Sequence, residues 1–164
     1  MTRAAAKAFY NKAVSDPETG YITNFDALDS LDVVYDDIEA KTLALTTKTV
    51  STLSLAANAS SHTTFPLGNQ YRVVKVTTNV PARVRLYVDN ASMLADAVRE
   101  VGTDPDDGAG VLLDVVTSAD LLAMNLSPLV DGWLATGTDV SATITNLAAT
   151  SQVVAVTLTA FVGG

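Results

Sequence analysis

Residues 82–88 have the sequence Ala82-Arg83-Val84-Arg85-Leu86-Tyr87-Val88, in which every second side chain is apolar. A period of two is that of a β-strand with one apolar face, so the arginines and the tyrosine point to the opposite face. Residues 152–162 repeat the alternation but carry apolar or small side chains on both faces. That pattern predicts a central strand, or a strand covered by a partner.

Six further stretches combine β-branched or aromatic residues with flanking Asn, Gly, Pro or Asp. Together with the two above, the predicted strands are 49–56, 63–67, 71–79, 82–89, 111–117, 121–126, 140–147 and 152–162. Eight short strands predict a mainly β protein with an antiparallel β-sandwich or jelly-roll-like domain. One helical interruption is expected at residues 91–100, with Asn90 as its N-cap.

The third and fourth predicted strands are expected to form a hairpin whose turn is centred on Val80. In that register Val76 faces Val84 on the apolar side. On the other side Lys75 faces Arg85. Two like charges directly opposite each other are unfavourable, so we expect an acidic group on that outer face.

The first 48 residues differ in texture from the rest and predict an N-terminal helical or extended arm, followed by the β-sandwich domain at residues 49–164. Apolar side chains in the arm recur at spacings of three and four residues, which places them on one helical face. This apolar stripe needs a partner and predicts docking or oligomerisation; a helix lying on its own domain is the alternative. Its residues are Phe25, Leu28, Leu31, Tyr35 and Ile38.

Composition excludes several classes of function. The 164 residues carry a net charge of −8, with 48 % hydrophobic residues, no cysteine and one histidine. The acidic balance argues against general nucleic-acid or anionic-membrane binding. The missing cysteines exclude disulfides, thiolate zinc sites and cysteine nucleophiles, and one histidine leaves little room for Ser-His-Asp catalysis. We therefore expect no enzyme, no cofactor, no nucleic acid and no membrane partner. Residues 1–7 show no signal-peptide pattern, so synthesis in a cytoplasm is expected.

The charge is unevenly distributed along the chain. Residues 49–99 carry five basic and two acidic side chains, whereas residues 100–164 carry eight acidic side chains and no basic one. The predicted basic hairpin, with Arg83 and Arg85 on its outer face, therefore suits an acidic protein surface such as residues 100–164 of a neighbouring copy.

Three further features are candidate sites. Trp133, the only tryptophan, falls in an expected loop as an interface anchor or as a ring packed at the end of the sandwich. His62 has no Cys, His or carboxylate near it in sequence and is predicted to be a solvated loop residue. Asp104, Asp106 and Asp107 are weak calcium candidates. Their spacing is not that of an EF-hand loop, and an ordinary polar turn is the favoured interpretation.

The order of these features resembles small virion structural proteins of tailed bacteriophages, of the head-fibre, capsid-decoration and tail-associated types. The resemblance covers about residues 70–164. It rests on four motifs, Arg83-Val84-Arg85-Leu86-Tyr87, Gly102-Thr103-Asp104-Pro105 leading to Gly110-Val111-Leu112-Leu113-Asp114, Leu126-Ser127-Pro128, and Thr145-Asn146-Leu147 before the last strand.

This resemblance implies a non-enzymatic, oligomeric protein, with a trimer favoured, whose N-terminal segment docks on other virion proteins. It implies localisation in the virion after synthesis in the host cytoplasm. The alternative is a glycan- or receptor-binding β-sandwich that uses Tyr71, Tyr87, Trp133 and the Asp104–Asp107 loop, with or without calcium.

Overall fold

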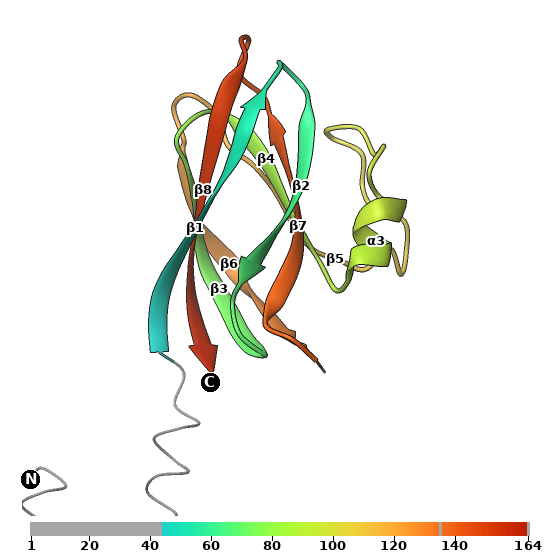
Figure 1. The fold of residues 1–164 in the computed structure, drawn as a ribbon, viewed down its shortest axis with the longest axis vertical. Coiled ribbons are helices and arrows are strands. Elements are labelled where there is room, and N and C mark those ends of the chain that lie inside the picture. Colours follow the sequence, from blue (N-terminus) through green and yellow to red (C-terminus); the bar gives the residue numbers. More distant parts are fainter. Residues whose placement is uncertain (1–43, 135, 164) are drawn as a thin grey trace, which may run out of the picture. The chain divides into compact units, whose positions relative to one another are not determined.

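The computed structural model describes residues 44–134 and 136–163, which form two antiparallel four-stranded sheets packed face to face (Figure 1). Sheet A has the strand order β1 (Ala44–Leu55), β8 (Gln152–Gly163), β3 (Gln70–Thr78), β6 (Ala123–Trp133). Sheet B has the strand order β2 (Ser60–Pro66), β7 (Asp139–Asn146), β4 (Ala82–Tyr87), β5 (Val111–Val116). The predicted stripe of Phe25, Leu28, Leu31, Tyr35 and Ile38 lies outside the described residues.

The strand pairing is nested. The first strand pairs with the eighth, the second with the seventh, the third with the sixth and the fourth with the fifth. Two further pairings, β3 with β8 and β4 with β7, join these pairs into the two sheets. This is the arrangement of an eight-stranded jelly roll, and the predicted mainly β, antiparallel architecture is confirmed.

The core lies between the sheets and is built from alternate residues of each strand. Val84 and Leu86 of β4 are fully buried, as are Val154, Val156 and Leu158 of β8. Burying one such side chain stabilises the fold by about 1.5–3 kcal/mol relative to leaving it exposed. The period-two pattern of the sequence therefore determines which face of each strand is internal.

All eight predicted strands are present, and β8 is central, between β1 and β3, as its two apolar faces predicted. Several boundaries differ, and two of the differences bear on the predictions above. β1 begins at Ala44, so the predicted start of the sandwich at residue 49 lies inside the first strand. β6 extends to Trp133, which therefore ends a strand and does not lie in a loop.

The predicted hairpin is wrong, because β3 belongs to sheet A and β4 to sheet B. The connection between them carries the chain across the sandwich. Asn79 anchors it to β8: its Nδ2 donates to the Val153 carbonyl at 3.0 Å, and its Oδ1 accepts from the Ala155 amide at 2.8 Å. Lys75 and Arg85 thus lie on different sheets and do not face each other.

The predicted helix is shorter than expected and begins one residue earlier. It is α3 (Asn90–Ala95), and its N-cap is Asp89, whose carboxylate accepts from the Ser92 amide at 2.7 Å. Hydrogen bonds from the backbone of Ser92 lower the pKa of Asp89. Over the described residues, the structure contains no helix that is both long and apolar enough to cross a membrane.

Candidate functional site

The outer side of β4, in sheet B, is polar in sequence but buried in the structure. Arg83, Arg85 and Tyr87 point away from the core, as their alternation requires, yet all three are at most 2 % exposed. They are covered because residues 88–110, which we call the helical loop, contain α3 and project beside sheet B between β4 and β5 (Figure 1). A buried guanidinium needs a counter-ion, and the helical loop supplies it.

Asp96, the residue after α3, is the centre of this arrangement. Its carboxylate accepts from Arg85 Nη1 at 2.7 Å and from the Tyr87 hydroxyl at 2.8 Å. It also accepts from Arg99 Nε at 2.6 Å and Nη2 at 3.1 Å. Arg85 Nη1 donates in addition to the Asp96 carbonyl at 2.7 Å. One carboxylate therefore binds three side chains from the sheet and the loop.

Asp114 of β5 is the second acceptor. Arg83 binds it with two parallel hydrogen bonds, of 2.9 Å from Nε and 2.7 Å from Nη2, and Arg99 Nη1 donates to it at 2.8 Å. The two arginines also hold the loop backbone, since Arg83 Nη1 donates to the Arg99 carbonyl and Arg99 Nη1 to the Thr103 carbonyl. We call the six residues of this network the charged cluster: Arg83, Arg85, Tyr87, Asp96, Arg99 and Asp114.

In the charged cluster the pKa values of the two carboxyl groups are lowered, and those of Arg99 and Tyr87 are raised. Burial opposes ionisation of Asp96 and Asp114, but hydrogen bonds from the arginines, and from Tyr87 to Asp96, outweigh it and lower both pKa values. The hydrogen bond to Asp96 raises the pKa of Arg99. Burial, followed by the hydrogen bond to Asp96, raises the pKa of Tyr87 to about 12. At neutral pH the cluster holds three cations and two anions.

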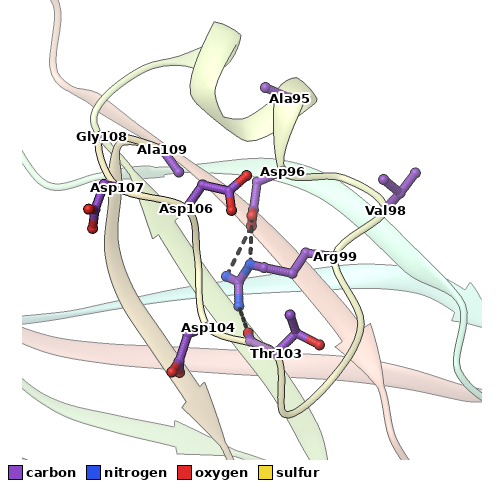
Figure 2. Close-up of a pocket in the computed structure, with 10 residues that line it drawn as sticks. All are labelled: Ala95, Asp96, Val98, Arg99, Thr103, Asp104, Asp106, Asp107, Gly108 and Ala109. Atoms are coloured by element: carbon purple, nitrogen blue, oxygen red, sulfur yellow. Dashed lines mark hydrogen bonds and ion pairs between the residues drawn. The ribbon is translucent and has the colours of Figure 1, made fainter.

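A hollow of about 400 Å³ lies beside the charged cluster, between α3 and residues 103–108, which we call the aspartate loop. Figure 2 shows Arg99 on its wall, and the side chains of Asp104 and Asp107 directed away from that of Asp106. Over the described residues, no group of three or more His, Cys, Asp or Glu side chains is placed to hold a metal ion. The three calcium candidates are therefore not brought together.

The structure corrects the prediction of an exposed basic hairpin. Arg83 and Arg85 are buried and paired with carboxylates of their own chain, so they do not form a surface for an acidic partner. Acidic groups do lie on this face, as Asp96 and Asp114, but the pairing of Lys75 with Arg85 from which such a group was expected does not occur. The rings of Tyr71 and Tyr87, which the glycan alternative used, are buried as well.

The outer face of sheet A carries the second candidate site. Trp133 is 67 % exposed at the end of β6 and lies opposite Gln70 of β3. Two pairs further along, Arg72 Nε and Nη2 donate to the two carboxylate oxygens of Asp131, at 2.5 and 3.0 Å. We call these four residues the Trp133 platform. A shallow hollow of about 280 Å³ lies between them, and Tyr71 and Gly132 also line it.

Gly132 has a structural role beneath the platform. A Cβ at this position would coincide with the ring of Tyr71, the residue opposite it on β3. The glycine therefore lets the tyrosine ring lie across β6 on the inner side of the sheet. The side chains of the two flanking pairs are left on the outer side.

His62 lies in β2 and not in the predicted loop. Its Nδ1 forms a hydrogen bond of 3.1 Å with the Thr143 hydroxyl, and its side chain is exposed.

The charged cluster could not be predicted from the sequence, because its members come from a strand, a loop and a second strand. The acidic group expected near Arg85 was inferred from a pairing with Lys75 that the structure does not contain.

No family model, no curated protein and no solved structure matches this chain.

Proposed function

We propose that this protein is a non-enzymatic structural component of a phage virion. In this proposal it assembles through its N-terminal arm and its β-domain as a capsid-decoration or head-fibre protein, or as a neck or tail component. The observation that carries the proposal is the strand order of sheets A and B, since eight-stranded jelly rolls recur in viral capsid domains. Lectins and cupins share that architecture, so the fold alone does not decide between assembly and ligand binding.

The chemistry of the charged cluster supports a non-enzymatic role. Its carboxylates each accept hydrogen bonds from two arginines, and lowered pKa values hold them as anions. A general acid or base needs a pKa near the working pH and contact with a substrate. Asp96 and Asp114 do not meet the first condition, and their contacts serve to fasten the helical loop to sheet B.

The proposed assembly element is the apolar stripe of residues 25–38, with a trimer as the favoured form and synthesis in the host cytoplasm before incorporation. The test is the solution mass of the full chain, measured by light scattering after gel filtration. We expect three times the monomer mass of 17.1 kDa. The double variant Leu31→Asp, Tyr35→Asp should be monomeric. Asp32→Asn, on the same segment but outside the stripe, should remain trimeric. A monomeric wild-type protein would contradict self-assembly.

Ligand binding is the second candidate function, as a glycan- or receptor-binding β-sandwich. The Trp133 platform favours it, because a tryptophan that is two-thirds exposed beside hydrogen-bonding side chains is a recognisable binding surface. The aspartate loop contributes no metal-binding cluster to this candidate.

A further inference from the structure

We propose that the Trp133 platform binds a neutral pyranose sugar, with one ring face stacked on the indole and the ring hydroxyls hydrogen-bonded to Asp131, Arg72 and Gln70. The inference deepens the second candidate function, ligand binding, and is independent of the assembly function.

The exposed indole supplies the apolar part of the site. Trp133 is 67 % exposed, although a tryptophan ring gains more than most side chains from burial. It shares the outer face with Asp131, because the two residues are two positions apart on β6. A pyranose has a face of C–H groups that is apolar and flat enough to cover such a ring. Its hydroxyls project around the edge, toward the neighbouring pair.

The polar groups of the platform fit hydroxyls in both donor and acceptor character. Asp131 offers carboxylate oxygens that accept hydrogen bonds, whereas Arg72 only donates, and the Gln70 amide does both. The Arg72 and Asp131 side chains are 47 % and 60 % exposed, so a ligand can reach both from solvent. Each charged partner is held by the other, in two parallel hydrogen bonds, before any ligand arrives. Such preorganisation reduces the cost of ordering side chains on binding.

The charge balance of the platform selects among hydroxylated ligands. The guanidinium of Arg72 is matched by the carboxylate of Asp131, and the hydrogen bonds from Arg72 lower the pKa of that carboxyl. The site therefore carries no net charge at neutral pH. A phosphate or sulfate could bind the Arg72 guanidinium only by displacing the Asp131 carboxylate, and it would then lie next to that negative charge. A neutral sugar needs neither step.

The size of the hollow limits the ligand. A volume of about 280 Å³ is at the lower end of small-molecule sites, and the hollow is shallow. It accommodates a single ring, with further sugar units extending over the exposed outer face. Affinity for one ring is therefore expected in the millimolar range, which corresponds to about −4 kcal/mol.

The chain offers a direct probe, because Trp133 is its only tryptophan. The full-length protein is titrated with the methyl glycosides of glucose, galactose, mannose and N-acetylglucosamine, and tryptophan fluorescence is followed. We expect a saturable change in emission with at least one glycoside and none with inorganic phosphate. A response to phosphate alone, or to no glycoside up to roughly ten times the expected dissociation constant, overturns the proposal.

Variants test the contacts with the same signal. Asp131→Ala removes the acceptor and should raise the dissociation constant about tenfold or more, because a hydrogen bond to a charged group is lost. Asn125→Ala, also exposed on β6 and on the same face, is the matched control and should bind as the wild type does. Equal binding by Asp131→Ala and wild type contradicts the site. If the tryptophan emission shifts as the protein concentration rises, and the solution mass rises with it, a second copy of the chain binds the platform. That result also refutes the proposal.

Discussion

Asp96→Asn tests the reasoning about the charged cluster most sharply. The substitution preserves the shape of the side chain but removes the charge that faces Arg85 and Arg99. Because Arg85 is about 2 % exposed, water cannot replace the carboxylate that it loses. The new amide also presents donors where the carboxylate presented only acceptors, so at least one guanidinium N–H faces another donor.

The expected magnitude follows from the contacts that remain. Removing one partner of a buried ion pair costs about 3–5 kcal/mol, because the other charge stays buried. Arg99 keeps Asp114, and Arg85 keeps the Asp96 carbonyl and a position 5.9 Å from the centre of the Tyr87 ring. We therefore expect the lower half of that range. Whole domains are stable by about 5–15 kcal/mol, so the variant should fold but lose a large part of its stability.

Urea unfolding measures the loss. For an m value of about 2 kcal/mol/M, the midpoint should fall by roughly 1.5–2 M. Asp131→Asn is the control, since it breaks an ion pair that is half exposed on both sides and should cost about 0–1 kcal/mol. If the two variants lose equal stability, burial of the charged cluster does not have the energetic consequence argued here. The double variant Arg85→Met, Asp96→Asn should recover part of the loss, because it removes the unpaired charge.

The same residues give the wild type a defined acid sensitivity. Asp96 and Asp114 have lowered pKa values in the folded state, so the unfolded state binds more protons near pH 4. Their contribution to stability is complete above the unfolded pKa of about 4 and is lost as the pH falls through the folded pKa values. Asp96→Asn should lose less stability over this window than the wild type. A steeper decline in the variant would show that the sign is wrong.

Other consequences of the structure can be tested singly. Asn146→Ala should lower the free energy of unfolding in urea by about 2–4 kcal/mol. The buried Nδ2 of Asn146 donates to the carbonyls of Leu55 and Thr150, and the substitution removes this donor. Unchanged stability would contradict this prediction. Gly132→Ala should cost about 1–3 kcal/mol, since its Cβ displaces the Tyr71 ring, and near-ultraviolet circular dichroism should report the ring movement. A chelator should leave the melting temperature unchanged; a drop would show that the aspartate loop holds a cation after all.

The strands could be predicted from sequence because each is a local pattern. Alternation with a period of two, bounded by turn residues, identified all eight. The partners of each strand could not be predicted in the same way. The connection at Asn79 has the composition of a hairpin turn, but its side chain binds β8 and the chain crosses to the other sheet. Nothing in the alternation of β3 or β4 distinguishes these two outcomes.

The same distinction between local pattern and strand pairing applies to the candidate sites. Alternation placed Arg83 and Arg85 correctly on the face opposite the core, but exposure was inferred from charge, and the inference was wrong. The helical loop covers these two arginines. Its position depends on two ion pairs, of Arg85 with Asp96, 11 residues away in sequence, and of Arg83 with Asp114, 31 residues away. Trp133 was singled out as either an interface anchor or a ring packed at the end of the sandwich, and its exposure disagrees with the packed ring. Its neighbours Arg72 and Gln70 could not be predicted, because they depend on the pairing of β3 with β6.

The two sheets differ in what covers their outer faces. The helical loop covers the outer side of β4 in sheet B and pairs the buried charges there, although Arg85 Nε has no hydrogen-bond partner and Val116 of β5 stays exposed. The outer face of sheet A still exposes Leu45, Trp133 and Val153 to solvent. Leu45 and Val153 lie at opposite ends of the β1–β8 pair, so they are scattered singly and do not by themselves mark a contact surface. On the outer face of sheet A the proposed binding site is therefore the Trp133 platform, and Trp133→Ala should weaken sugar binding with little effect on stability.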